Sequence, residues 1–319
     1  MAIKAVFGGA AISPNSGFNN AKAIQELLET LKKEGVTTID TARLYAGSEE
    51  LIGSTPGHGD FVIDTKLVGG FTPGAAGKDK CIEDAEDSLK RLQIKQVDIL
   101  YLHAPDKSTP IEETIEGINE VYKKGLFKRF GLSNFTAEEV QQVYDAAKSK
   151  GYVLPTVYQG NYNPVARKTE TLLFPTLRKL GISFYAYSPI AGGFLTKTKQ
   201  QIEEGVSRFS EQAIGGLYRR LYNKPSFLEA LTEWNDIAEK EGVSKAELAY
   251  RWVGYNSLLK EELGDAVIFG ASSLKQVEQT AQALKKGPVS EEAAKRIQKI
   301  WESVEADSFV DNWQVMSGQ

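Results

Sequence analysis

The sequence predicts an α/β protein, a (β/α)8 TIM barrel in which residues 1–319 form a single domain with long loops at the C-terminal face. Eight short runs rich in apolar and β-branched residues are spread along the chain, and amphipathic helical patterns lie between most of them. Continuous apolar runs are typical of parallel strands that are buried on both faces. A chain of 319 residues suits such a barrel, and no Pro/Ser-rich linker marks a second domain.

Eight strands that alternate with helices are compatible with a closed barrel or with a doubly wound open sheet. A doubly wound dinucleotide-binding sheet would carry G-x-G-x-x-G directly after its first strand. The segment from Gly8 to Ser13 reads Gly-Gly-Ala-Ala-Ile-Ser and lacks that spacing, which favours the barrel. The predicted strands are Lys4–Gly8, Thr37–Ile39, Phe61–Lys66, Val97–His103, Phe127–Leu132, Thr156–Gln159, Ser183–Tyr187 and Ala266–Gly270.

The helices between the strands are predicted from apolar residues at i, i+3, i+4 and i+7. Ile24, Leu27, Leu28 and Leu31 follow this spacing, and Gly35 stands where the helix would end. Further helices are placed by capping boxes at Thr136/Glu139 and Ser244/Glu247, and by Pro110 in the first turn of a helix carrying Ile111, Ile115, Ile118 and Tyr122.

Two segments interrupt this alternation. Residues Lys197–Phe227 form a long polar stretch after the seventh strand, and Ala306–Gln319 form a tail with Phe309, Trp313 and Met316. Long insertions in barrels are usually functional loops. The tail aromatics would cap a substrate pocket or pack on the barrel wall, and the sequence leaves both alternatives open.

The composition excludes several classes of function. The net charge is −4 with acidic and basic residues interspersed, so the chain lacks the clustered basic face that nucleic acid requires. Apolar runs such as Ala266–Phe269 are far too short to span a bilayer, and the N-terminal residues show no cleavage signature. The single cysteine, Cys81, rules out an intramolecular disulfide and fits a reducing compartment. We therefore expect a soluble, cytoplasmic protein without nucleic-acid or membrane partners.

Polar residues gather where the predicted strands end, which is the catalytic face of such barrels. Asp40 and Tyr45 follow the second strand, Lys66 ends the third and His103 ends the fourth. Each alone has an ordinary explanation, as a turn cap, a half-buried tyrosine, a solvated lysine or a structural histidine. The only other histidine, His58, lies in a loop, so the two histidines give no convincing ligand set for a metal-dependent hydrolase.

Together, these four side chains form the acid–base set that the reduction of a carbonyl group needs. A tyrosine can donate a proton to the carbonyl oxygen, although its ordinary pKa is about 10. An ammonium such as that of Lys66 would lower the pKa of Tyr45, and Asp40 would hold the ammonium in place. His103 would orient the carbonyl oxygen through a hydrogen bond.

In these residues the sequence resembles the aldo-keto reductase superfamily, whose catalytic tetrad is Asp, Tyr, Lys and His at the ends of consecutive barrel strands. The five-residue spacing from Asp40 to Tyr45 matches that tetrad, and Lys66 and His103 fall at the ends of the next two strands. The resemblance covers essentially the whole chain. It implies NADPH (NADP+) as the cofactor, Tyr45 as the general acid, and a small-molecule carbonyl substrate bound by Tyr45 and His103.

The resemblance also assigns contacts with the cofactor. Ser133, Asn134 and Gln159 would hold the nicotinamide carboxamide, Tyr187 would stack on the nicotinamide ring, and Asp40 would lie beside it. Two adjacent glycines allow the backbone to approach phosphate oxygens closely, and a lysine adds charge. The segment around the pyrophosphate would be Ser188, Pro189, Ile190, Ala191, Gly192, Gly193, Phe194, Leu195, Thr196 and Lys197.

The adenosine end of the cofactor would lie at a helix N-terminus, which is a natural anion site. Many members of the superfamily have a basic residue at the position of Gln276 and Asn at the position of Thr280. Arg208 would compensate by reaching the 2′-phosphate. The residues assigned to this end are Ser272, Ser273, Gln276, Gln279, Thr280 and Arg208.

Finer detail is similar to the aflatoxin aldehyde reductases, the group that also reduces succinic semialdehyde. The similarity lies in Ala249–Trp252, in Gly264–Ile268 and in the pair Tyr218 and Arg219. By this resemblance, Tyr218 and Arg219 lie at the substrate mouth and favour carboxylated or dicarbonyl substrates. The alternative is that Arg219 and its neighbour Arg220 form a solvated pair.

We therefore expect an NADPH-dependent aldo-keto reductase that reduces aldehydes, dialdehydes or reactive ketones to alcohols. The alternative is a regulatory NADP(H)-binding protein resembling the potassium-channel β subunits, which share the fold, the tetrad and the cofactor but act chiefly by binding. Those subunits form tetramers, so the oligomeric state would separate the two. The sequence leaves that state open, a homodimer included.

Overall fold

A computed structural model describes residues 3–317, in which eight parallel strands close into one barrel. Neighbouring strands are consecutive in the sequence, and β8 pairs with β1 to close the barrel. Every predicted strand is present with ends within two residues of the prediction, so the (β/α)8 barrel is confirmed. The strands are β1 (Lys4–Gly8), β2 (Thr38–Asp40), β3 (Val62–Leu67), β4 (Val97–Leu102), β5 (Phe127–Ser133), β6 (Pro155–Asn161), β7 (Ser183–Tyr187) and β8 (Ala266–Phe269).

Apolar side chains form two buried clusters, one on each side of the strands. A small cluster that includes Ile99 and Tyr101 lies inside the barrel. A larger cluster, which includes Leu100 and Leu102 of the same strand, lies between the strands and the helices. Successive residues of a strand point to opposite faces. The same alternation directs Lys66, which is opposite Tyr101 in the register of β3 and β4, into the barrel.

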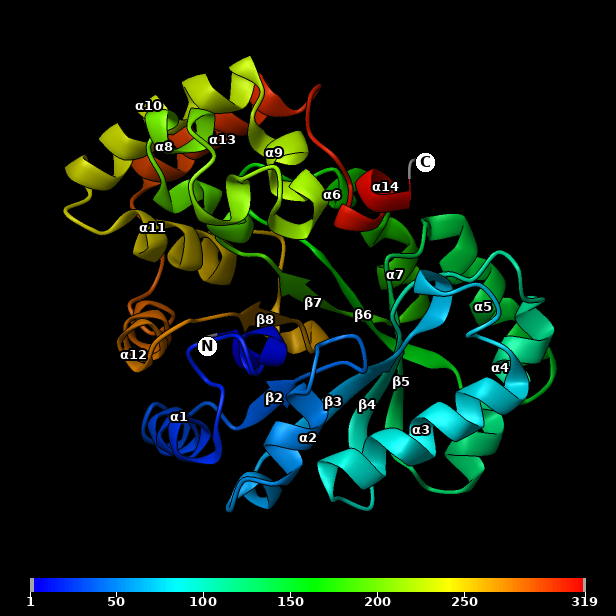
Figure 1. Ribbon diagram of the computed structural model, residues 1–319. Helices are drawn as coiled ribbons and strands as arrows, with labels where there is room; N and C mark the ends of the chain where they lie inside the picture. Colours follow the sequence, from blue (N-terminus) through cyan, green and yellow to red (C-terminus); the bar gives the residue numbers. More distant parts are fainter. Residues whose placement is uncertain (1–2, 318–319) are drawn as a thin grey trace.

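Helices surround the barrel and cover the outer face of the strands (Figure 1). Within residues 3–317, no helix combines the length and the apolar character needed to cross a membrane. Three short helical turns also bear on the site, namely η3 (Gly69–Phe71), η4 (Ala191–Thr196) and η7 (Trp252–Asn256). The helices are α1 (Ala21–Lys33), α2 (Ser48–Gly53), α3 (Lys78–Leu92), α4 (Ile111–Lys123), α5 (Ala137–Ser149), α6 (Thr169–Leu172), α7 (Phe174–Leu180), α8 (Lys199–Glu203), α9 (Leu217–Tyr222), α10 (Pro225–Lys240), α11 (Lys245–Arg251), α12 (Leu274–Ala283), α13 (Glu291–Val304) and α14 (Asn312–Ser317).

The helix ends follow the predicted capping signals in part. The capping box of Thr136 and Glu139 at α5 is confirmed. At α11 only half of the predicted box forms, because Ser244 accepts the backbone N–H of Glu247 while the Glu247 carboxylate binds basic side chains instead. Pro110 is the N-cap residue of α4 and precedes the first turn that was predicted to contain it.

Residues 197–227, predicted to be a long polar loop, fold mainly into short helical segments. They include α8 and α9, which together with α10 and α13 form a lobe on one side of the barrel mouth (Figure 1). The prediction was wrong about this segment because α9 is too short to show a helical repeat. Its stability comes instead from aromatic contacts such as that of Tyr222 with Phe194, whose ring centroids are 4.8 Å apart.

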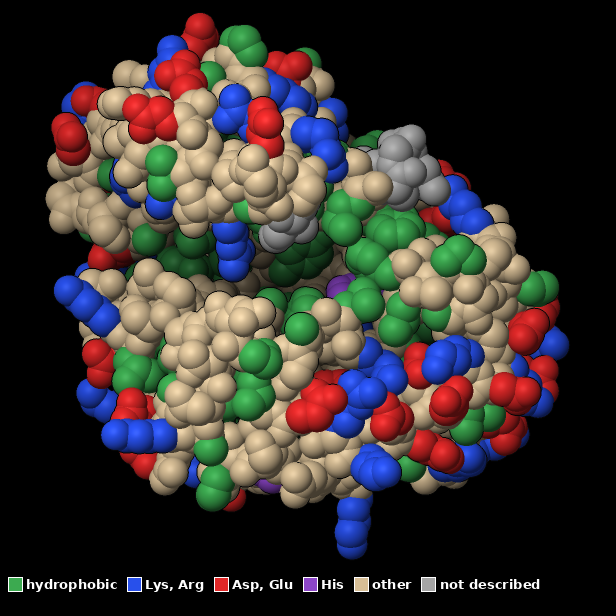
Figure 2. All heavy atoms as spheres, in the orientation of Figure 1, with side chains coloured by type: hydrophobic (Ala, Val, Ile, Leu, Met, Phe, Trp, Pro, Cys, Tyr) green, Lys and Arg blue, Asp and Glu red, His purple; other side chains and the backbone are tan. Residues whose placement is uncertain are grey.

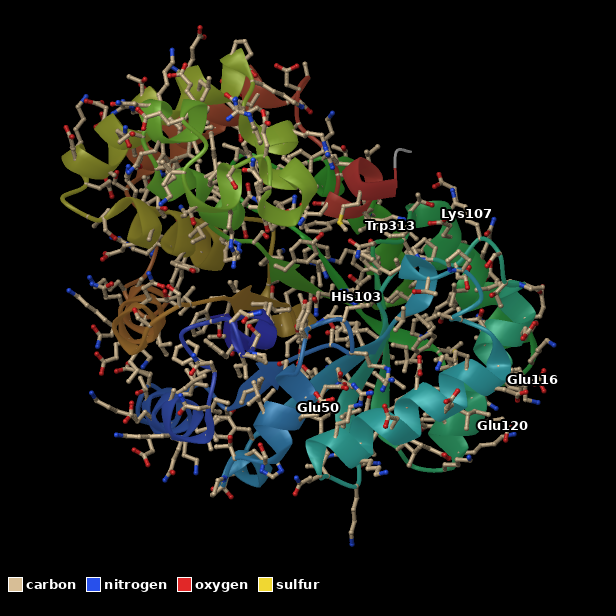
Figure 3. All side chains as sticks on the ribbon, in the orientation of Figure 1. Glu50, His103, Lys107, Glu116, Glu120 and Trp313 are labelled. Carbon is tan, nitrogen blue, oxygen red and sulfur yellow. The ribbon has the colours of Figure 1, made fainter. Side chains whose placement is uncertain are left out.

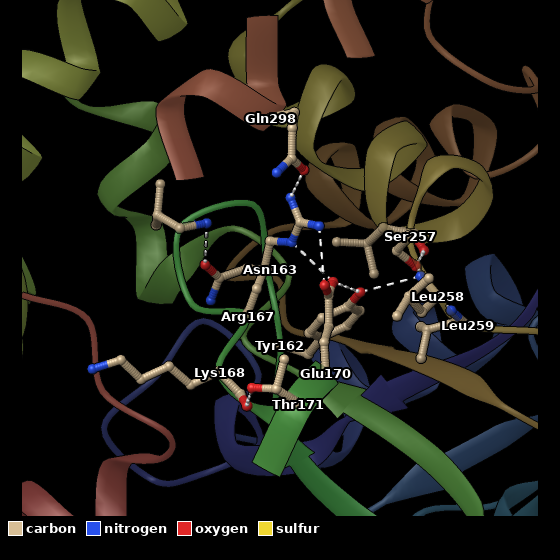
Figure 4. A network of polar contacts seen from close by, with 12 residues as sticks. Tyr162, Asn163, Arg167, Lys168, Glu170, Thr171, Ser257, Leu258, Leu259 and Gln298 are labelled. Atoms are coloured by element: carbon tan, nitrogen blue, oxygen red, sulfur yellow. Dashed lines mark hydrogen bonds and ion pairs between the residues drawn. The ribbon is translucent and has the colours of Figure 1, made fainter. Parts of the chain in front are cut away.

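A polar network joins the segment after β6 to this lobe (Figure 4). Tyr162 donates its hydroxyl to Glu170 Oε1 at 2.6 Å, and Arg167 donates to both carboxylate oxygens of Glu170 at 2.8 and 3.0 Å. Arg167 also donates to Gln298 Oε1 on α13 at 2.7 Å. The backbone N–H of Leu258, beyond η7, donates to the Tyr162 hydroxyl at 3.1 Å. The network therefore fixes α13 relative to the barrel.

Candidate active site

The strand ends open into a cleft between the barrel and the lobe of α8, α9, α10 and α13 (Figure 2). His103 follows β4 and lies at this opening, below Trp313 of α14 (Figure 3). Asp40 ends β2, Lys66 lies in β3, and Tyr45 lies in the loop between β2 and α2. The structure brings all four predicted tetrad residues together.

Lys66 and Asp40 form an ion pair inside the barrel. Lys66 Nζ lies 2.5 Å from Asp40 Oδ2 and also donates to the carbonyl oxygen of Thr41 at 2.8 Å. The Lys66 side chain is 0% exposed. Burial acts to lower the pKa of Lys66, but the charge of Asp40 and its hydrogen bond contribute to a net rise. Lys66 is therefore an ammonium held in a fixed position.

The ring of Tyr45 lies close to this ammonium, with 5.1 Å between the ring centroid and Lys66 Nζ. The ring of His103 meets the Tyr45 ring edge-on, with 5.9 Å between the centroids. Burial raises the pKa of the Tyr45 phenol above its ordinary value, and the charge of Lys66 acts against this rise. The predicted lowering by Lys66 is present, but the cost of desolvating a phenolate exceeds it, so the pKa of Tyr45 rises. Tyr45 is thus protonated at neutral pH and can donate a proton.

The loop that carries Tyr45 is held by side chains that the sequence did not single out. Arg43 Nη1 donates to the carbonyl oxygen of Asp84 on α3 at 3.0 Å, and its Nη2 lies 3.3 Å from the Asp84 carboxylate. The hydroxyl of Thr41 donates to that of Ser48, the first residue of α2, at 2.8 Å. These contacts fix the loop on both sides of Tyr45.

His103 is buried and neutral. Burial, followed by the positive charge of Lys66, holds the pKa of His103 well below its ordinary value. Its carbonyl oxygen accepts a hydrogen bond from Asn134 Nδ2 at 2.8 Å. Its ring nitrogen Nδ1 is buried without a partner in the part of the chain that the structure describes. A neutral imidazole keeps one N–H, which can position a carbonyl oxygen without competing as the proton donor.

An aromatic wall stands beside His103. The ring of Phe71 in η3 lies 4.9 Å from the His103 ring and 4.7 Å from the ring of Trp313, between centroids. The two tail aromatics have different surroundings. Trp313 borders the cleft, whereas Phe309 packs against Tyr222 in the lobe, with centroids 5.4 Å apart.

The side chains predicted to hold the nicotinamide are linked to the tetrad. Gln159 Nε2 donates to Asp40 Oδ1 at 2.9 Å, and the Tyr187 hydroxyl donates to Asn134 Oδ1 at 3.2 Å. Ser133 is buried at the end of β5. Asn134 has a φ of +63°, a left-handed conformation that is uncommon outside glycine and that clusters at functional sites.

The predicted pyrophosphate segment has an unusual backbone. Ser188 and Ala191 each have a φ of +54°, and Gly193 has a φ of +104°. A Cβ on Gly192 would lie 1.9 Å from Cε1 of Tyr218, whereas a Cβ on Gly193 would meet nothing within 4 Å. Gly192 therefore makes room for Tyr218, and Gly193 presents open backbone of the kind that a phosphate group needs.

The remaining residues of this segment have different surroundings. The Thr196 hydroxyl donates to the Gly193 carbonyl oxygen at 2.7 Å. Phe194 and Leu195 belong to the buried apolar cluster and hold the turn in place. Pro189 is buried, and Ile190 and Lys197 are half-buried.

The predicted adenosine site is at the start of α12. Ser273 is the N-cap residue and accepts the backbone N–H of Gln276 at 3.4 Å. Gln276 Oε1 in turn accepts the backbone N–H of Ser272 at 2.8 Å. Gln279 is exposed and Thr280 is buried. The helix N-terminus is present as predicted, and the Gln276 amide closes its first turn.

Of the predicted substrate contacts, Tyr218 lies at the cleft and Arg219 turns away from it. Tyr218 packs on Gly192 of η4, with the guanidinium carbon of Arg208 5.9 Å from its ring centroid. Arg219 Nη1 donates to the carbonyl oxygen of Glu203 at 3.2 Å, at the end of α8. In this arrangement the Arg219 guanidinium caps a helix.

Comparison with known proteins agrees with this fold and site. The sequence model of the Aldo/keto reductase family matches residues 4–302. The oxidoreductase sirO of Leptosphaeria maculans is 41% identical over 89% of this chain and 87% of its own length. An aldo-keto reductase of Pseudocercospora fijiensis is 38% identical over 88% of this chain and 98% of its own. The human aflatoxin B1 aldehyde reductase member 2 is 38% identical over 89% of this chain and 82% of its own.

A closed (β/α)8 barrel with this cluster at its mouth defines a barrel oxidoreductase that acts on carbonyl compounds. The chain belongs to the aldo/keto reductase family. Among its relatives are the aflatoxin aldehyde reductases, which confirms the finer resemblance found in the sequence.

Proposed function

We propose that the protein uses NADPH to reduce aldehydes, dialdehydes or reactive ketones to alcohols, with Tyr45 as the general acid. The supporting observation is the position of Lys66 Nζ, 2.5 Å from Asp40 Oδ2 and 5.1 Å from the centroid of the Tyr45 ring, beside a neutral His103. This set supplies a proton donor, a fixed cation that stabilises the phenolate, and a hydrogen-bond donor for the carbonyl oxygen.

The residues along the cleft fit a dinucleotide cofactor. Gly193 supports this assignment, because its φ of +104° is one that other residues rarely adopt and a Cβ there would meet no protein atom within 4 Å. When bound, NADPH supplies the hydride for the carbonyl carbon. We assign the nicotinamide to Ser133, Asn134, Gln159 and Tyr187, the pyrophosphate to the segment from Ser188 to Lys197, and the adenosine phosphate to Ser272, Ser273, Gln276, Gln279, Thr280 and Arg208.

Each tetrad residue then has one task. The O–H bond of Tyr45 breaks as its proton moves to the carbonyl oxygen of the substrate, and the resulting phenolate is stabilised by Lys66. Asp40 keeps Lys66 in position and charged. His103 donates a hydrogen bond to the same carbonyl oxygen and sets its orientation.

The aromatic wall indicates the class of substrate. Phe71 and Trp313 provide flat apolar surfaces beside His103, where an aromatic aldehyde would pack. A relative named as an aflatoxin B1 aldehyde reductase supports an aldehyde substrate. Tyr218 lines the same cleft. A contact between Arg219 and carboxylated substrates stays a prediction, and it requires the Arg219 side chain to move away from the end of α8.

The first prediction tests this function. We would follow the loss of reduced-nicotinamide absorbance with NADPH and with NADH, against 4-nitrobenzaldehyde, succinic semialdehyde and a vicinal diketone. We expect faster oxidation with NADPH. Tyr45→Phe should lower kcat by about 10²- to 10⁴-fold, because it removes the proton donor, and should leave the Kd of NADPH nearly unchanged.

Two outcomes would contradict the assignment. Loss of NADPH binding in Tyr45→Phe would mean that this residue is part of the cofactor site rather than the proton donor. Tight NADPH binding by the unmodified protein without turnover of any substrate would favour the regulatory binding protein.

A further inference from the structure

Two lysines, Lys197 and Lys245, contact each other at the end of the η4 turn. Lys245, the first residue of α11, donates from Nζ to the backbone carbonyl oxygen of Lys197 at 2.9 Å. Both lysines are half-buried. Burial, and then the positive charge of Lys197, lowers the pKa of Lys245 below its ordinary value. Lys197 was predicted as a cofactor contact, whereas no sequence pattern pointed to Lys245.

The two lysines lack a negatively charged partner in the part of the chain that the structure describes. Some lysines of the molecule are paired with carboxylates, as Lys66 is with Asp40 and Lys78 with Glu116. Neither Lys197 nor Lys245 has a carboxylate partner among residues 3–317, and the only charge that acts on Lys245 is of the same sign. Two like charges that are partly removed from water disfavour each other unless an anion lies between or beside them.

The position of the pair indicates which anion is required. Lys197 directly follows η4, in which a Cβ on Gly193 would meet no protein atom within 4 Å. Helix α11 packs against both η4 and α12, the helix that begins at Ser273. Lys245 is therefore on the helix that contacts both the proposed pyrophosphate segment and the helix of the proposed adenosine site.

We infer that Lys245 joins Lys197 in binding a phosphate group of the dinucleotide, and that Lys245 is a determinant of cofactor affinity. The inference rests on the proposed function, since it takes NADPH as the ligand. An ammonium pair binds the pyrophosphate, which NADPH and NADH share, or the 2′-phosphate, which only NADPH carries. It also supplies the cation that Gln276, on α12, does not provide.

The second prediction tests this inference by binding rather than by turnover. NADP+, NADPH and NADH are titrated against the full chain, and the Kd is measured by quenching of its tryptophan fluorescence. Lys245→Gln removes the charge but keeps a donor for the Lys197 carbonyl. We expect it to raise the Kd of NADPH by about 10- to 100-fold, the range expected for a lost hydrogen bond between charged groups. Lys245→Arg should bind nearly as well as the unmodified protein.

The matched control is Lys150→Gln, at the C-cap of α5 and outside the proposed cofactor site, which should leave every Kd unchanged. A second readout is the salt dependence of the Kd, which should be shallower in Lys245→Gln because one charge has been lost. A change in fold alone would not flatten this dependence and would appear as a lower Tm.

The outcomes separate the alternatives. Equal weakening of NADPH and NADH assigns the pair to the pyrophosphate, and weakening of NADPH alone assigns it to the 2′-phosphate. Tight binding by the unmodified protein with an unchanged Kd in Lys245→Gln overturns the inference and leaves the proposed function intact. Failure of the unmodified protein to bind either dinucleotide overturns both.

Discussion

Asp64 is a carboxyl group inside the barrel that the proposed chemistry does not use. It lies opposite Asp40 in the register of β2 and β3 and is fully buried. Its Oδ1 accepts the backbone N–H of Ile99 at 3.1 Å, while Oδ2 is buried without a partner among residues 3–317. Burial, followed by the negative charges of Asp40 and Asp98, raises the pKa of Asp64 to about 8. Asp64 is therefore protonated at neutral pH.

This titration gives the third prediction. The pKa of Asp64 is about 8 in the folded chain and near 3.8 when unfolded, so folding binds a proton between these pH values. Its favourable contribution is complete below pH 3.8 and is lost as the pH rises to about 8. Asp64→Asn has no proton to lose and should raise the free energy of unfolding, with a gain that is larger at pH 8 than at pH 5 by a few kcal/mol. Urea unfolding at both pH values measures this gain. An equal gain in the free energy of unfolding at pH 5 and pH 8 would contradict the prediction.

At the scale of elements, the strands and the tetrad were predictable because each depends on a local signal. A strand is a short apolar run, and Asp40, Lys66 and His103 are reactive residues at the ends of such runs. Arg43 and Phe71 carry no such signal. Their roles come from contacts with α3 and α14, which are distant in the sequence. The net rise in the pKa of Tyr45 was likewise beyond the sequence, since it depends on the degree of burial in the assembled barrel.

The aromatic wall formed by η3 and α14 gives the fourth prediction. Trp313→Ala should raise the KM for 4-nitrobenzaldehyde by about tenfold, because it removes a flat surface next to His103. The KM for a small aliphatic aldehyde should change little. Met316→Ala is the matched control, since Met316 lies on the same helix and is 45% exposed. Equal effects on the two substrates would show that α14 supports the fold of the cleft rather than the binding of aromatic groups.

At the scale of the whole molecule, the lobe and the barrel depend on Arg167. Its guanidinium carbon lies 5.1 Å from the ring centroid of Trp252 in η7 and 5.6 Å from that of Trp301 in α13, while it binds Glu170 through two hydrogen bonds. Both members of the ion pair are largely buried, with side-chain exposures of 12% and 13%. Removing one partner would leave a desolvated charge and would loosen the lobe, which includes α9 at the edge of the cleft.

The fifth prediction follows from this arrangement. Arg167→Met should lower the free energy of unfolding by about 2–4 kcal/mol and weaken NADPH binding, because the lobe that closes the cleft is no longer fixed. The control is Arg296→Met, since Arg296 also binds two carboxylates, those of Glu233 and Asp236, but both are exposed and both lie within the lobe. Such pairs contribute about 0–1 kcal/mol, so this variant should keep its NADPH affinity. Equal losses of stability and of NADPH affinity in Arg167→Met and Arg296→Met would contradict this prediction. They would show that apolar contacts, rather than the buried network of Arg167, hold the lobe.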